Sequence, residues 1–76
     1  MTAVEEFMET LRPSKNGNWW RPYHGRTICV FRNRRGGWSW SIALSKDEVR
    51  YSSRRCPRRE DAAADLLAEL EHLEDV

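Results

Sequence analysis

The chain has 76 residues, of which 39% are hydrophobic and 33% charged, and this length allows one domain with one thin core. The composition is too apolar for a disordered chain, and no apolar run approaches the roughly 20 residues that span a bilayer, so a disordered or membrane protein is not expected. The net charge of +1 conceals three blocks: residues 1–11 carry −3, residues 12–59 carry +11, and residues 60–76 carry −7.

Residues 1–12 predict a short N-terminal helix. Apolar side chains recur at the i, i+3, i+4, i+7 spacing of an amphipathic helix: Val4, Phe7, Met8 and Leu11. Thr2 can cap this helix, and Pro13 ends it because the residue before a proline avoids the helical conformation. Residues 13–18 have the composition of a linker. The residues of the first helix carry no basic side chain before Arg12, which is unlike a signal peptide, so a cytoplasmic protein is expected.

Residues 19–56 predict an antiparallel sheet of three strands, or of four if residues 19–23 add an edge strand. Residues 26–32 are rich in β-branched and aromatic side chains, and residues 33–37 have the glycines of a hairpin loop. Residues 38–44 alternate cleanly, with one face made by Trp38, Trp40, Ile42 and Leu44. The third strand follows, and its Val49 and Tyr51 are expected on the same covered face.

Residues 57–76 predict a C-terminal helix with Pro57 at its first position. Its apolar stripe consists of Ala63, Leu66, Leu67, Leu70 and Leu73. Its water-facing side is expected to carry Asp61, Asp65, Glu69 and His72. A sheet with one apolar face needs a cover, and this helix offers the longest apolar stripe. The predicted fold is therefore a single α+β domain over residues 1–76, in the order α-β-β-β-α.

The second face of this sheet is expected to be polar and basic. It would carry Ser39, Ser41 and Arg50, and the strand 26–32 would add either Cys29 and Phe31 or Ile28, Val30 and Arg32. Arginine offers paired donors to phosphate oxygens and guanine edges, and a narrow β-ribbon can enter a major groove. The candidate nucleic-acid-binding residues are Arg26, Arg32, Arg34, Arg35, Ser39, Ser41, Arg50, Arg54 and Arg55. DNA is favoured over RNA.

Three segments carry a resemblance to AP2/integrase-type DNA-binding domains. They are residues 34–38 with Ile42, residues 49–51, and residues 59–63 at the helix start. The resemblance implies a sheet whose free face lies in the DNA major groove, with Arg34, Arg35 and Arg50 as contacts and the helix behind the sheet. The order α-β-β-β-α also resembles double-stranded-RNA-binding domains, with Arg58 and Arg59 in place of a basic cluster.

Two other interpretations stay open. The acidic ends could fold against the arginines and neutralise them, which would leave an ordinary solvated surface. The chain could instead be a protein-binding regulator or inhibitor of a nucleic-acid-processing machine, acting through an exposed tryptophan beside arginine or through its acidic helix. No enzyme activity and no cofactor are expected, and Cys29, Cys56, His24 and His72 lack the paired spacing of a zinc site. The oligomeric state is left open.

Overall fold

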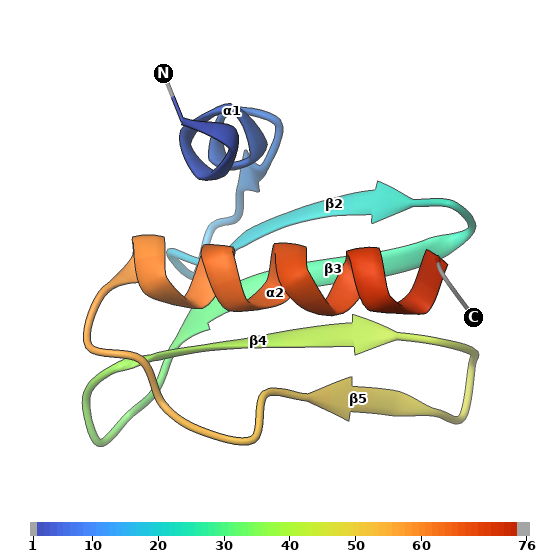
Figure 1. Ribbon diagram of the computed structural model, residues 1–76. Helices are drawn as coiled ribbons and strands as arrows, with labels where there is room; N and C mark the ends of the chain where they lie inside the picture. Colours follow the sequence, from blue (N-terminus) through green and yellow to red (C-terminus); the bar gives the residue numbers. More distant parts are fainter. Residues whose placement is uncertain (1, 75–76) are drawn as a thin grey trace.

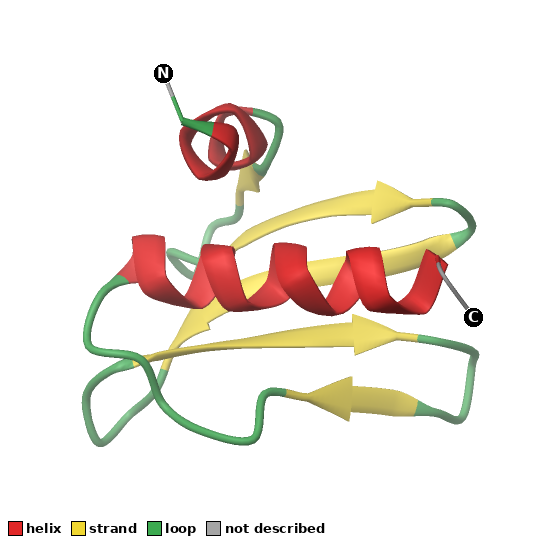
Figure 2. Ribbon diagram, viewed as in Figure 1, coloured by secondary structure: helices red, strands yellow, loops and turns green. Residues whose placement is uncertain are grey.

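The computed structural model describes residues 2–74, which fold into a five-stranded antiparallel sheet with one helix before it and one after it (Figures 1 and 2). The elements are α1 (Ala3–Glu9), β1 (Arg12–Pro13), β2 (Trp19–Tyr23), β3 (Arg26–Arg32), β4 (Trp38–Ala43), β5 (Val49–Tyr51) and α2 (Arg59–Glu74). The α+β class is confirmed, but the prediction of three or four strands is wrong. Neither of the two helices among these residues is long and apolar enough to cross a membrane.

The additional strand, β1, lies where the sequence predicts the last residue of the N-terminal helix and the first residue of a linker. Arg12 pairs with Trp20, and Pro13 pairs with Trp19. Residues 14–18 form the turn that joins the two strands, in which the Ser14 N–H donates to the Asn18 carbonyl at 2.8 Å. Two residues are too few to show strand alternation, and proline is typical of an edge strand because it cannot donate to the ladder. The segment therefore gives almost no strand signal in the sequence.

Consecutive strands are neighbours in the sheet, in the order β1-β2-β3-β4-β5. The helix α2 crosses one face of the sheet over β3 and β4 (Figure 1). Under it lie the buried side chains of Ile28, Val30, Trp40 and Ile42, against Ala62, Ala63, Leu66 and Leu70 of α2. This confirms the alternation predicted for residues 38–44 and most of the apolar stripe of the helix. Burying side chains of this size contributes roughly 1.5–3 kcal/mol each for the aliphatic ones.

The helix α1 packs against α2 and extends the core beyond the sheet (Figure 1). It contributes Phe7, and Leu11 follows it in the chain, both of them buried. The predicted cap is confirmed, since the Thr2 hydroxyl accepts a hydrogen bond from the Glu5 N–H at 3.1 Å. The helix ends at Glu9, earlier than predicted, because the Thr10 and Leu11 N–H groups close the last turn onto Phe7 and Met8.

The start of α2 also differs from the prediction. The helix begins at Arg59, and the Arg58 carbonyl accepts its first backbone bond, so Pro57 precedes the helix by two residues. Cys56 holds this approach in place through two backbone hydrogen bonds of 2.7 Å with Trp38. The predicted helical residues 1, 75 and 76 lie outside the described residues.

The orientation predicted for the third strand is wrong. In β5, Tyr51 pairs with Ser41 and Arg50 pairs with Ile42. Tyr51 therefore faces away from α2, and Arg50 lies on the same side of the sheet as α2. Val49 and Tyr51 are 44% and 63% exposed instead of buried. The physical reason is Glu69 of α2, which accepts a hydrogen bond from the Arg50 guanidinium and forms an ion pair with it. The helix flank above β5 is therefore polar, and the apolar pair lies on the other face.

Candidate nucleic-acid interface

One face of the sheet is covered by α2, and the strand registers identify the residues on the other face. Side chains alternate along a strand, so each residue paired with an outward-facing neighbour also points outward. We call this set the open face: Arg12, Trp20, Pro22, Thr27, Cys29, Phe31, Ser39, Ser41, Ala43, Val49 and Tyr51. The two alternatives for residues 26–32 are thereby decided in favour of Cys29 and Phe31.

The open face is aromatic where the sequence predicts it to be basic. Trp20 is 36% exposed, and Phe31 and Tyr51 meet edge to face with ring centroids 6.5 Å apart. Among the strand residues, Arg12 is the one basic side chain on this face, and its guanidinium lies 5.7 Å from the centre of the Trp20 ring. Such a cation–π contact orients the exposed ring and keeps a positive charge beside it.

The two candidate serines differ in accessibility. Ser39 is only 7% exposed, and its hydroxyl accepts a hydrogen bond from the Asn33 side-chain amide at 2.6 Å. Ser41 is half-buried between Cys29 and Tyr51. The open face therefore has small side chains between its aromatic rings. Ser39 also binds Asn33 of the hairpin loop.

Three of the candidate arginines lie on the helix side of the sheet. Arg26 and Arg32 share the parity of Ile28 and Val30, and Arg50 binds Glu69. These side chains cannot act together with Ser41 on one surface. The face of the sheet opposite α2 is therefore not the basic face that the sequence predicts. These arginines are present in the strands, but the strand register places them on the same side as α2.

The other candidate arginines gather at one end of the sheet. In an antiparallel meander, alternate connections lie at the same end, and here these are the turns 14–18 and 33–37 and the connection 52–58 (Figure 1). Their exposed basic side chains form what we call the basic end: Lys15, Arg34, Arg35, Arg54, Arg55 and Arg58. The structure thus places Arg34, Arg35, Arg54 and Arg55 at the same end of the sheet, the end nearest Phe31, although the side chain of Arg54 points toward α2.

Acidic residues are separated from the open face. The strands contain no Asp or Glu, and the acids lie in α1, in α2 and beyond, and in the turn that joins β4 to β5 at the far end. Two of them bind arginines on the helix side: Glu69 binds Arg50, and Asp61 binds Arg58 at 3.2 Å. The hydrogen bond from Arg58 to Asp61 also raises the pKa of that guanidinium. The acids of the described residues thus neutralise part of the helix side, and none of them belongs to the strands that make up the open face.

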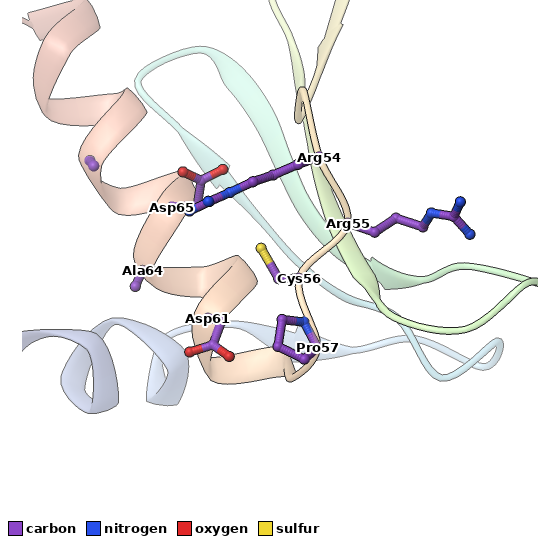
Figure 3. A pocket seen from close by; sticks show the side chains of 8 residues that line it. Arg54, Arg55, Cys56, Pro57, Asp61, Ala64 and Asp65 are labelled. Atoms are coloured by element: carbon purple, nitrogen blue, oxygen red, sulfur yellow. The ribbon is translucent and has the colours of Figure 1, made fainter.

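A cavity of about 450 Å³ lies between the connection 52–58 and α2 (Figure 3). Arg54 points into it toward Asp65, whereas Arg55 points away from the helix on the other side of the connection (Figure 3). Asp61 and Asp65 face the cavity together with the small side chains of Ala64 and Ala68. This mixture of charges does not suit a polyanion, so the cavity is not part of the candidate interface.

The cysteines and histidines form no site. Cys29 on the open face and buried Cys56 are both free thiols, and burial raises the pKa of each above its ordinary value. A raised pKa keeps a thiol protonated and weakly nucleophilic near neutral pH. Within residues 2–74, no three His, Cys, Asp or Glu side chains lie close enough together to hold a metal ion.

Of the three aromatic residues on the open face, Trp20 and Tyr51 are exposed and Phe31 is half-buried, and the sequence predicts only the exposure of a tryptophan. The adjacency of Trp19 and Trp20 does predict that one is exposed: Trp19 packs against the core under Arg59, whose guanidinium lies 4.5 Å from its ring centre, and Trp20 faces outward. For Phe31 the sequence leaves both faces of the sheet open, and for Tyr51 it predicts the covered face, which is wrong. Serines directly across from both rings are the signal that could have identified an uncovered face.

Comparison of the chain with protein-family models, with curated proteins and with solved structures gave no match. The resemblance to AP2/integrase-type domains therefore stays a prediction. The candidate interface rests on its own geometry and charge.

Proposed function

We propose that this domain is a non-catalytic nucleic-acid-binding module whose contact surface is the open face together with the basic end. The observation that carries the proposal is the separation of charge. Exposed basic side chains gather at one end of a sheet whose strands contain no acid. Arg34 and Arg35 lie in the hairpin loop and Arg55 points away from α2, whereas Arg54 points toward Asp65 and Arg58 binds Asp61. A polyanion can reach Arg34, Arg35 and Arg55 from the side of the connection opposite Asp61 and Asp65.

The role of the arginines in this proposal differs from that in a major-groove reader. Arg34 and Arg35 lie at the tip of an exposed hairpin loop, where they can contact phosphates. Base-edge contacts from the strands would require long polar side chains on the open face, where the middle strands offer serine, threonine and cysteine instead. Phosphate contacts position a nucleic acid without reading its sequence, so the module is proposed to tolerate many sequences.

The test compares variants that remove charge from the two sides of the sheet. We expect Arg34→Ala/Arg35→Ala to weaken binding to labelled DNA and RNA and to reduce the slope of log K against log salt by about 1.4–1.8, because each phosphate contact contributes roughly 0.7–0.9. Arg50→Ala is the control: it removes one positive charge on the helix side, and it should change the slope by much less than the roughly 0.7–0.9 expected for each charge that the double variant removes. Equal losses in the two variants, or no salt-sensitive binding by the wild type, would contradict the proposal.

A second candidate function, binding of a protein partner, is favoured by one specific observation. β5 is an edge strand, and its outward-facing Val49 and Tyr51 are both exposed. An exposed apolar edge can accept a strand from another chain. This candidate ranks second because it gives no role to the basic end. It predicts that the wild type binds neither single-stranded nor duplex probes.

A further inference from the structure

The open face carries one row of side chains that crosses the entire sheet. Arg12, Trp20, Cys29, Ser41 and Tyr51 are consecutive partners from β1 to β5. Neighbouring strands lie about 4.8 Å apart, so Trp20 and Tyr51 stand roughly 14 Å apart with only a thiol and a hydroxyl between them. Phe31 lies one row nearer to the basic end and contacts Tyr51 edge to face.

Three aromatic rings on one uncovered surface favour a ligand that has flat faces to stack on them. Tyr51 is 63% exposed although a sheet of this size has an apolar core in which a ring could be buried. Nucleobases provide such faces, and stacking on aromatic side chains is tolerant of sequence because every base has one. In a duplex the base faces are already stacked on each other, so only unpaired bases can use these rings.

The charge around the row argues for a nucleic acid rather than an apolar protein surface. The Arg12 guanidinium lies beside the Trp20 ring at one edge, and the exposed Arg34 and Arg35 lie beyond Phe31 at the basic end. An arrangement of rings with cations at their margin suits bases whose backbone runs past the same residues. An apolar partner would have to desolvate these arginines without compensation.

We propose that the open face binds single-stranded nucleic acid, with bases stacked on Trp20, Phe31 and Tyr51 and the backbone held by Arg12 and the basic end. This inference rests on the proposed function and specifies its ligand. Because the rings stand on β2, β3 and β5 of one sheet, they engage two or three bases at once, and the small Cys29 and Ser41 leave room between Trp20 and Tyr51.

The experiment measures fluorescence anisotropy of labelled oligonucleotides of about 12 residues, single-stranded and as the matching duplex, at one salt concentration. The wild type should bind the single strand more tightly than the duplex. Tyr51→Ala and Trp20→Ala should each weaken single-strand binding by about 5- to 150-fold, the range measured for loss of one stacked base. Tyr51→Phe keeps the ring and should retain binding, and Ser45→Ala, an exposed control in the turn that joins β4 to β5, outside the open face and the basic end, should bind like the wild type.

Alkylation of Cys29 gives an independent readout. A single strand seated on the row should protect this thiol, whereas buried Cys56 reports whether the domain stays folded. Duplex binding as tight as single-strand binding, unchanged in the Tyr51→Ala and Trp20→Ala variants, would overturn the inference and leave the proposed function standing. No binding of either probe would overturn both. Concentration-dependent self-association that Tyr51→Ala abolishes, with no probe bound, would identify a second copy of the chain as the occupant.

Discussion

Trp40 combines the largest buried ring of the core with one polar atom that needs a partner. Its side chain is 4% exposed, and its indole N–H donates to the Asp65 carboxylate of α2 at 2.7 Å. A buried donor without an acceptor costs about 1–3 kcal/mol, so this contact fixes the position of the helix on the sheet as well as satisfying the indole. The prediction that Asp65 belongs to the water-facing side of α2 missed this contact.

Replacement of Asp65 tests how much this hydrogen bond contributes. Asp65→Ala should lower the free energy of unfolding by about 1–3 kcal/mol, because the indole N–H loses its acceptor. Asp65→Asn keeps a carbonyl oxygen and should lose only about 1 kcal/mol, the difference between a charged and a neutral acceptor. Urea unfolding monitored by tryptophan fluorescence measures both, and equal losses in the two variants would show that the acceptor is not what matters.

The backbone of the hairpin between β3 and β4 favours glycine at two positions. Gly36 and Gly37 both have positive φ, of 95° and 81°, and the Asn33 N–H donates to the Gly37 carbonyl at 3.0 Å. A Cβ on Gly37 would lie 3.1 Å from the Cys56 carbonyl oxygen, whereas nothing lies within 4 Å of one on Gly36. The hairpin therefore packs tightly against the connection that leads into α2.

Alanine at these two positions separates backbone strain from steric conflict. Gly36→Ala should lower the free energy of unfolding by about 1–2 kcal/mol, because a side chain disfavours the left-handed conformation. Gly37→Ala carries the same strain and also meets the Cys56 carbonyl, so it should lose about 1–3 kcal/mol more. Thermal unfolding followed by circular dichroism checks the order, and a smaller loss for Gly37→Ala would contradict the close approach.

The elements differ in how far their sequence could predict them. The six-residue strand β4 and the sixteen-residue α2 are long enough for their periodicity to identify both the element and its buried side. The two-residue β1 and three-residue β5 are not, since three residues fit either face of a sheet equally well. The orientation of β5 depends on the contact of Arg50 with Glu69, 19 residues further along the chain, and no local pattern contains that information. Because β5 has the orientation opposite to the predicted one, the open face carries Tyr51 where a basic Arg50 is expected.

At the scale of the whole molecule, the charge blocks of the sequence become sides and ends of the fold. The acidic helices lie together on one side of the sheet, and the basic connections lie at one end of it (Figure 1). Acids of α2 bind Arg50 and Arg58, so part of the expected neutralisation is present, and the described strands place no acid on the open face. The two helices can sit side by side despite their acids because Phe7 and Leu11 bury an apolar contact between them and the sheet.

This arrangement predicts that α1 unfolds together with the rest of the domain. A 76-residue domain has a stability of roughly 4–11 kcal/mol at 0.05–0.15 kcal/mol per residue. Phe7→Ala removes a buried ring and should cost about 3–5 kcal/mol, a large share of that total. Val4→Ala changes a half-buried residue of the same helix and should cost about 1 kcal/mol or less.

In urea, tryptophan fluorescence and far-ultraviolet circular dichroism should give coincident transitions, because the tryptophans report on the sheet and the dichroism on the helices. A Phe7→Ala variant that lost helical signal while its fluorescence transition stayed at the wild-type urea concentration would show instead that α1 is a separate unit, docked on a core that is stable without it.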